Sequence, residues 1–250
     1  MVYFIGAGPG DPELITIKAL KLLQNADVII YAGSLVNKEI LKYAPDSCAT
    51  YNSAEMDLEQ IVDIMSKAYV QGKIVIRLHT GDPSIFGAIR EQMDELERRN
   101  VEYEVVPGVS SFCAAAAVLK KEYTLPEVSQ TVILARMQGR TLVPGEQAIE
   151  KLASHKATMI IFLSIHMIDE LVEKLKTGYS DDTPAAVVYK ASWPDQKVLT
   201  GTLATISSLV KKNHITKTAL LLIGDFLGDE YQLSKLYDKN FSHEYRSANS

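Results

Sequence analysis

The sequence has few cysteines and no cluster of them. Only Cys48 and Cys113 are present, far apart, with no C-x-x-C spacing and no adjacent histidine cluster. A disulfide framework and a structural zinc site are therefore not expected, since each needs several suitably spaced side chains. Two reduced thiols, as in a cytoplasmic protein, are the simplest interpretation. The histidines show no metal-ligand spacing either, so we expect no metal site.

Long apolar runs and an excess of positive charge are also missing. The longest apolar runs, such as 159–163 and 219–223, are far shorter than the roughly 20 residues that cross a bilayer. The N-terminus lacks a basic stretch followed by an apolar core, so no signal peptide is expected. The formal net charge is −5, which leaves no uniform basic surface for nucleic acid. We expect a cytoplasmic protein with neither membrane nor nucleic acid as a partner.

The first half of the chain alternates strand and helix patterns. Apolar runs rich in Val, Ile and Tyr predict strands at Val2–Gly6, Val28–Tyr31, Ile74–Leu78 and Glu102–Val106. Helical patterns are found at Glu13–Gln24, Leu58–Val70, Ile85–Arg98 and Ser110–Leu119, and Asp57 is placed to cap the second of these helices. This alternation is typical of an α/β domain with a mainly parallel sheet.

A second α/β series follows the polar stretch Lys120–Ser129, which is the best candidate linker. Strands are predicted at Thr131–Ala135, Thr158–Leu163, Ala185–Tyr189 and Thr218–Gly224, with an antiparallel strand at Lys197–Gly201. Helices are predicted at Glu146–Ser154, Ile168–Lys176 and Leu203–Lys212. The tail from Tyr231 has no strong periodicity, and whether it packs or frays is left open. We thus expect an N-terminal α/β domain, 1–120, and a C-terminal α/β domain, 121–250, in these 250 residues.

Loops rich in Gly, Pro and Asp follow three of the predicted strands. They are Gly6-Ala-Gly-Pro-Gly-Asp11, Thr80-Gly-Asp-Pro83 and Pro107-Gly-Val-Ser-Ser111. Ligand loops of open α/β sheets lie at strand ends like these, so a cleft lined by several strand ends is expected.

The first loop does not fit a dinucleotide site. Asp11 occupies the place of the third glycine in G-x-G-x-x-G, and Pro9 has no N–H to offer a phosphate. A plain NAD or FAD site is therefore disfavoured. The alternative for this loop alone is a tight strand-to-helix turn that binds no ligand.

Three segments of the sequence together resemble the tetrapyrrole methylases, which use S-adenosylmethionine as methyl donor. They are FIGAGPGDPELIT at 4–16, GDPSIFG at 81–87 and PGVSS at 107–111. The segments NSAEMD at 52–57, QGRTLVP at 138–144 and KASWPDQ at 190–196 resemble the family's precorrin-4 C11-methyltransferases, including the cobalt-precorrin-4 enzymes. The resemblance implies two α/β domains with the ligand cleft between them, a homodimer, and a role in cobalamin biosynthesis.

The resemblance also implies contacts with S-adenosylmethionine. In the first domain these fall on Pro9, Thr80, Gly81, Asp82, Ile85, Ser110 and Ser111; in the second they fall on Ser164, Tyr189, Ala191 and Ala219. Asp82 offers a carboxylate, and Ile85 can lie against the adenine. The alternatives are that Asp82 and Ser110 cap the helices that follow them, and that the residues of the second domain are ordinary strand-end packing.

A corrinoid substrate would need arginines, because it carries many carboxylates and the guanidinium fork binds carboxylates with two parallel hydrogen bonds. Arg140 is the preferred contact, since the R-T-x-V-P pattern recurs in the C11 group. Arg136, Arg77 and His79 are further candidates for substrate binding. The alternative for each is a solvated charge, or for Arg77 an ion pair within its domain.

Two positions depart from related patterns. Uroporphyrinogen-III methylases carry an Asp and a Lys proposed for proton transfer, where this chain has Ala32 and, approximately, Ser53, which argues against a uroporphyrinogen substrate. Leu142 stands where the C11 group usually has proline.

These observations predict an S-adenosylmethionine-dependent C-methyltransferase acting at C11 of cobalt-precorrin-4 or precorrin-4. No general base is evident, so no catalytic residue is assigned. The alternatives are another enzyme of this fold, acting at another precorrin position, on diphthine or on ribosomal RNA, and a nucleotide-binding protein without catalytic activity.

Overall fold

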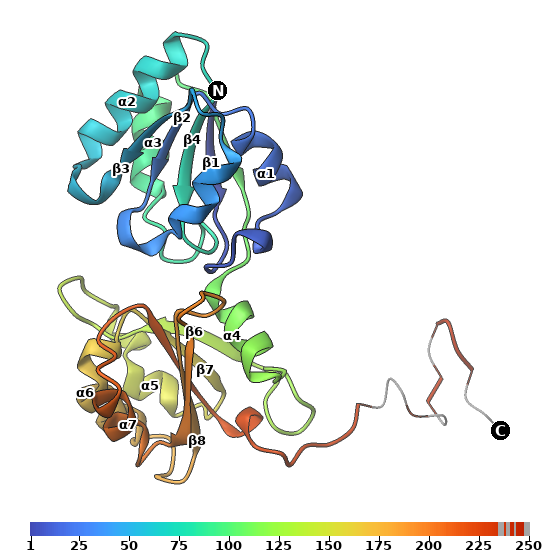
Figure 1. Cartoon of the computed structure of the whole chain (residues 1–250). Coiled ribbons are helices and arrows are strands. Elements are labelled where there is room, and N and C mark those ends of the chain that lie inside the picture. Colours follow the sequence, from blue (N-terminus) through green and yellow to red (C-terminus); the bar gives the residue numbers. More distant parts are fainter. Residues whose placement is uncertain (235–237, 239–240, 243, 248–250) are drawn as a thin grey trace. The chain divides into compact units, whose positions relative to one another are not determined.

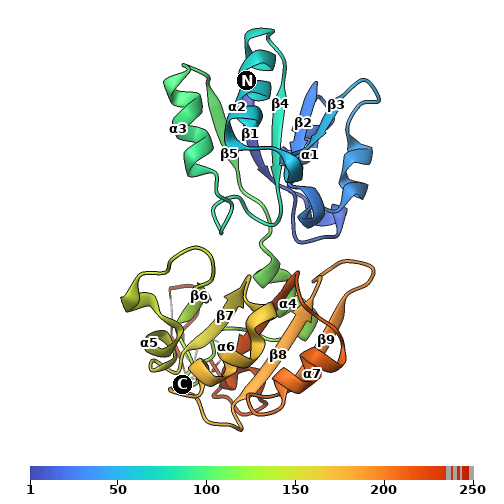
Figure 2. The same ribbon diagram turned by 90° about the vertical axis from the view of Figure 1, so that its left-hand side faces the viewer.

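The computed structural model describes residues 1–234, 238, 241–242 and 244–247 (Figures 1 and 2). The rest of the tail that begins at Tyr231 lies outside the described residues. Two compact units make up the chain: Met1–Ala115 with Lys190–Gln196, and Ala116–Tyr189 with Lys197–Ser250. The predicted division into 1–120 and 121–250 does not include this return of the chain to the first unit.

The first unit is built on a five-stranded sheet in the order β3-β2-β4-β1-β5, in which every neighbouring pair is parallel. Its strands are β1 (Val2–Gly6), β2 (Val28–Tyr31), β3 (Ala49–Asn52), β4 (Val75–His79) and β5 (Tyr103–Val106). The parallel sheet confirms the expected α/β class. Because all five strands run the same way, the loops that follow β1, β4 and β5 emerge at one edge.

Helices cover both faces of this sheet (Figure 2). These helices are α1 (Ile17–Leu23), α2 (Leu58–Val70) and α3 (Arg90–Arg98), and the chain passes into the second unit within α4 (Ser111–Leu119). Alternate strand residues enter two separate cores: Ile5 and Ile76 pack with Leu23 of α1, whereas Phe4 and Val75 pack with residues of α2 and α3. The division follows from the two-residue side-chain period of a strand.

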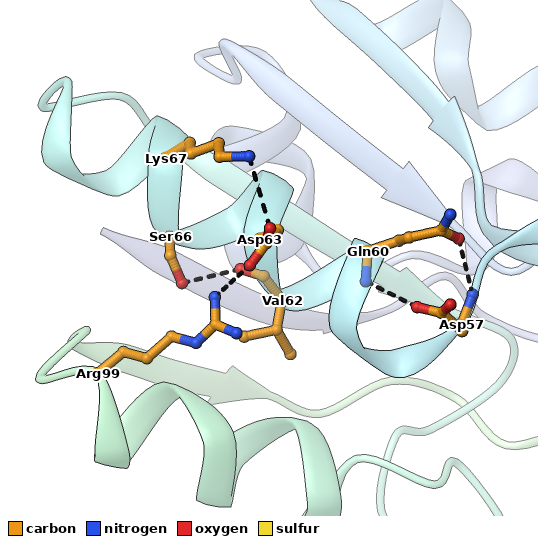
Figure 3. A network of polar contacts seen from close by, with 7 residues as sticks. All are labelled: Asp57, Gln60, Val62, Asp63, Ser66, Lys67 and Arg99. Carbon is orange, nitrogen blue, oxygen red and sulfur yellow. Dashed lines mark hydrogen bonds and ion pairs between the residues drawn. The ribbon is translucent and has the colours of Figure 1, made fainter.

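Polar contacts fix the start of α2 and connect it to the end of α3 (Figure 3). Asp57 Oδ1 accepts from the N–H of Gln60 at 2.8 Å, and Gln60 Oε1 accepts from the N–H of Asp57 at 3.1 Å, so the predicted cap is a full capping box. Farther along α2, Asp63 pairs with Lys67 at 3.5 Å and with Arg99 at 2.5 Å. Arg99 is the C-terminal cap residue of α3.

The second unit has a mixed sheet in the order β6-β7-β10-β8-β9. Its strands are β6 (Val132–Arg136), β7 (Thr158–Phe162), β8 (Pro184–Tyr189), β9 (Lys197–Thr202) and β10 (Ala219–Ile223). Only the β6–β7 pair is parallel. The antiparallel strand predicted from residue 197 is present as β9.

One face of the second sheet packs against three helices, α5 (Ile149–Ala153), α6 (Ile168–Leu175) and α7 (Ile206–Lys212). The segment predicted as a linker, Lys120–Ser129, is packed against this unit. Its Tyr123 ring lies edge-on to Phe226 at 5.2 Å between centroids.

The strand β3 and the start of α3 are two of the points at which the structure differs from the prediction. No strand was predicted at β3, whose four residues are all exposed and so carry no apolar pattern. Helix α3 begins at Arg90 and not at Ile85. Phe86 and Ala88 have φ angles of 54° and 50°, which a right-handed helix does not accommodate.

Candidate donor and substrate sites

Three loops of the first unit meet at the carboxyl edge of its sheet. The Gly81 N–H donates to Gly8 O at 2.8 Å, and the Gly8 N–H donates to Gly81 O at 3.3 Å. A Cβ atom at Gly6 would lie 2.5 Å from Gly81 O, and one at Gly108 would lie 2.3 Å from the same oxygen. The backbones of the three loops therefore lie too close together for a side chain at Gly6 or Gly108. The three predicted loops form one cluster.

Asp82 holds two of these loops together. Its Oδ1 accepts from the N–H of Ser84 at 2.8 Å and from the Ser84 hydroxyl, while Oδ2 accepts from the N–H of Gly108 at 2.8 Å. Burial acts to raise the pKa of the Asp82 carboxyl, but hydrogen bonds from Ser84 and Gly108 outweigh it and lower the pKa below its ordinary value. The carboxylate is thus ionised at neutral pH. It does not cap α3, which begins at Arg90.

Beside the Asp82 loop lies a cavity of about 270 Å³, lined by Arg77, His79, Thr80 and Ile85 among others. Arg77 is 5% exposed, and its guanidinium donates to two neutral acceptors, Gln92 Oε1 at 2.9 Å and Ile30 O at 3.2 Å. Burial lowers the pKa of Arg77 to about 10, so it keeps its charge at neutral pH. No ion pair for Arg77 exists within the described ranges.

His79 follows Arg77 on β4 with one residue between them and is 4% exposed. Its Nε2 has no hydrogen-bond partner in the part of the chain that the structure describes. Burial and then the charge of Arg77 lower the pKa of His79 to about 3. The imidazole is therefore neutral at physiological pH, with one nitrogen able to donate and the other able to accept.

The remaining donor candidates of the first unit lie in its loops. Pro9 is buried, and its carbonyl accepts from Trp193 Nε1 at 2.9 Å. Ser110 is buried directly before α4, and Ser111 is the first residue of that helix. Ala191 is buried and belongs to the first unit through the segment Lys190–Gln196.

Three donor candidates lie in the second unit. Tyr189 and Ala219 stand opposite each other in the antiparallel β8–β10 pair. Ser164 is fully buried, and its hydroxyl donates to Phe162 O at 2.7 Å and accepts from the N–H of Met137 at 2.8 Å. Since Met137 follows β6 and Ser164 follows β7, this hydroxyl fixes the ends of two neighbouring strands.

The two arginines of the second unit differ in their surroundings. Arg136 donates to Thr141 O at 3.2 Å and to Leu142 O at 2.9 Å, so it braces the loop that follows its own strand. Arg140 lies in that loop and is exposed. The loop therefore exposes the guanidinium of Arg140, while the guanidinium of Arg136 fixes the loop backbone.

Sequence reasoning missed the residues that support these groups. Gln92 accepts from Arg77, while Asn37 and Ser192 bond to the first loop. Asn37 and Gln92 carry no sequence signal. Trp193 carries one, since it is the only tryptophan and lies in a segment that resembles the C11 group.

The comparisons with known proteins agree with this architecture. The family described as Tetrapyrrole (Corrin/Porphyrin) Methylases matches residues 1–207. The Cobalt-precorrin-4 C(11)-methyltransferase of Methanocaldococcus jannaschii is 57% identical over 249 residues, which cover 99% of this chain and 96% of the relative. A solved structure of a cobalt precorrin-4 methyltransferase is 45% identical, with a TM-score of 0.89 over 91% of this chain and 96% of that one.

A more distant solved structure contains a ligand. It is the uroporphyrin-III C-methyl transferase of Thermus thermophilus complexed with S-adenyl homocysteine, 26% identical, with a TM-score of 0.75 over 90% of this chain and 98% of that one. The fold and the loops thus define an α/β methylase with two sheets. The chain belongs to the tetrapyrrole methylase family, which confirms the resemblance found in its sequence.

The described residues offer neither a metal cluster nor a membrane-spanning helix. They contain no group of three or more His, Cys, Asp or Glu side chains that could hold a metal ion. No helix among them has the length and apolar character that crossing a membrane requires.

Proposed function

We propose that this chain transfers a methyl group from S-adenosylmethionine to C11 of cobalt-precorrin-4, or of precorrin-4, in cobalamin biosynthesis. The observation that carries the proposal is near full-length similarity to a relative of that name at 57% identity. The three meeting loops and the cavity beside them supply a site on which the proposed donor and substrate contacts can be tested.

The donor half of the proposal rests first on the cluster around Asp82. S-adenosylmethionine offers a sulfonium cation, ribose hydroxyls and an adenine. The residues present fit these groups: the Asp82 carboxylate is ionised, the loops carry backbone acceptors, and Ile85 adds an apolar surface. We assign donor contacts to Pro9, Thr80, Gly81, Asp82, Ile85, Ser110, Ser111, Ser164, Tyr189, Ala191 and Ala219.

For Asp82 we also infer a positioning role. Both of its oxygens already accept hydrogen bonds from loop groups. Asp82 therefore shapes the loops as well as supplying negative charge near the donor.

The substrate half of the proposal rests on four residues. Arg77 and His79 line the cavity beside the donor loop, and among the described residues the hydrogen-bond partners of Arg77 are neutral, which favours a carboxylate in that cavity. Arg140 is exposed on a braced loop and can pair with a peripheral carboxylate. Arg136 holds that loop, so we assign its effect on substrate to the position of Arg140.

The chemistry asks little of the protein beyond position. When bound, S-adenosylmethionine would supply a methyl group that its positive sulfur already activates. The protein's contribution is to align the ring carbon with the methyl group and to exclude water. We assign no proton-transfer residue.

Turnover of purified protein with matched cobalt-loaded and metal-free precorrin-4 tests the proposal. Arg140→Ala should lower kcat/KM about ten- to a hundredfold while leaving S-adenosylhomocysteine binding unchanged. Arg140→Lys should recover only part of this loss, because a point charge does not reproduce the guanidinium fork. If both variants methylate precorrin-4 like the parent, Arg140 is a solvated charge; if the parent methylates neither substrate, the proposed function is wrong.

We further propose a cytoplasmic homodimer, on the strength of the family resemblance. Light scattering should then give twice the chain mass of 27.6 kDa. A constant single-chain mass across a wide concentration range would contradict it.

A further inference from the structure

A segment distant in sequence completes the first loop. Lys190–Gln196 connects β8 to β9 but belongs to the first unit. Trp193 Nε1 donates to Pro9 O at 2.9 Å, and Ser192 Oγ accepts from the N–H of Asp11 at 3.0 Å. From elsewhere in the unit, Asn37 Nδ2 donates to Gly10 O at 2.8 Å. Three consecutive loop residues, 9–11, thus each have a side-chain partner outside the loop.

The indole of Trp193 also packs directly on Gly10. A Cβ atom added at Gly10 would lie 2.0 Å from Trp193 Cδ1 and 2.3 Å from its Nε1. The φ angle of Gly10 is not in the left-handed region, so backbone conformation does not require glycine here. Glycine is required because the indole occupies the space of a side chain.

Contacts within the segment hold the indole in this place. The N–H of Ser192 donates to Gln196 Oε1 at 2.7 Å, and Lys190 pairs with Asp195 at 2.6 Å. The Lys190 ammonium lies 5.0 Å from the centroid of the Trp193 ring, within the range of a cation–π contact. These contacts orient the indole within the segment.

We propose that Trp193 is a positioning residue for the methyl donor: it locks the loop 9–11 into its binding shape by bonding to Pro9 and packing on Gly10. The inference rests on the proposed function, since Pro9 is one of the proposed donor contacts. A loop whose polar groups are already fixed loses less entropy when the donor binds, so affinity depends on the indole even without a direct contact.

The first experiment needs no ligand. Trp193 is the only tryptophan, so its emission reports the packing of the indole. Gly10→Ala should shift the emission to the red by displacing the indole into water. Gly145→Ala is the matched control, because a Cβ atom there meets nothing within 4 Å. Equal emission from Gly10→Ala and the parent would overturn the packing on which the proposal depends.

The second experiment is a double-mutant cycle on the full chain, with S-adenosylhomocysteine affinity measured by calorimetry. Gly10→Ala should weaken binding about tenfold or more in the parent, but less than about twofold when Trp193→Ala has already removed the indole. Trp193→Phe keeps a ring without the N–H and should weaken binding about three- to tenfold. The melting temperature of each variant is measured alongside.

These outcomes separate positioning from general stability. Equal cost of Gly10→Ala in both backgrounds overturns the proposal, as does parent-like binding by Trp193→Phe. If Trp193→Ala fails to fold, the Trp193→Phe affinity and the Gly10→Ala emission still decide it. If the parent itself binds no S-adenosylhomocysteine, the proposed function fails, while the emission test of the indole packing stands independently.

Discussion

Asp82 receives three hydrogen bonds from two segments of chain, so its replacement removes more than a charge. Asp82→Ala would leave the Gly108 N–H without its acceptor and would loosen the loop that follows β5. We expect S-adenosylhomocysteine binding to weaken by about 1–3 kcal/mol, measured by calorimetry. Ser84→Ala, which keeps the Gly108 bond, should lose less. Parent-like affinity in a folded Asp82→Ala protein would rule out this role.

His79 should make the stability of the protein depend on pH. Its pKa is lowered to about 3 in the folded chain, whereas an unfolded histidine titrates near 6.5. Between these values the unfolded state binds a proton that the folded state does not, so stability is complete above about pH 6.5 and falls as the pH decreases toward 3.

Urea unfolding at pH 7.5 and pH 5 measures this effect. The parent should lose on the order of 2 kcal/mol more than His79→Gln between these two pH values. His155→Gln is the control, because His155 is exposed. This variant should show the same pH dependence of stability as the parent. If His79→Gln loses as much stability as the parent, the burial of a neutral imidazole is not the cause.

At the scale of elements, the capping box of α2 gives the clearest test. Asp57→Ala removes the acceptor of the Gln60 N–H (Figure 3). The second bond of the box, from the N–H of residue 57 to Gln60 Oε1, is then no longer held in place by the first. The free energy of unfolding in urea should fall by about 1 kcal/mol. Ser66→Ala on the same helix should cost little, because the Ser66 hydroxyl bonds only to the carbonyl of Val62 one turn back. Equal losses in the two variants would contradict the capping role.

The elements that sequence reasoning located well are those whose pattern reflects a core. β1, β2 and α2 have the predicted bounds, since each alternates or repeats apolar residues against a buried layer. β3 was not predicted, because it lies at the sheet edge with all residues exposed and has no apolar pattern. α1 begins at Ile17 and not at Glu13, because Ile15 and Thr16 are extended and Thr16 caps the helix.

The same limit applies to the candidate site. Gly81 and Asp82 could be proposed from the sequence because their loop chemistry is local in sequence. The neutral partners of Arg77 were not predicted. Ile30 on β2 and Gln92 near the start of α3 contact Arg77 only in the folded chain. Trp193 is 184 residues away from its acceptor, Pro9, and no local pattern predicts such a contact.

At the scale of the whole molecule, the chain leaves the first unit within α4 and returns to it once. The returning segment, Lys190–Gln196, has both of its ends in strands of the second sheet, β8 and β9, which pair with each other along their length. The first unit therefore contains a part whose order depends on strands of the second. Stability of one unit should influence the other through this segment and its contacts with the loop 9–11.

We accordingly expect the protein to unfold in one cooperative transition. When β8 and β9 separate, Lys190–Gln196 loses its anchored ends, and Pro9 and Asp11 lose the partners that hold their loop. Trp193 emission and far-ultraviolet circular dichroism should change at the same urea concentration, and the calorimetric and van't Hoff enthalpies should agree. Trp193→Ala should split the calorimetric peak by weakening the connection, whereas Gly145→Ala should keep the single peak. Two separate transitions in the parent would show that the units unfold independently, and a single parent-like peak in Trp193→Ala would show that another contact couples them.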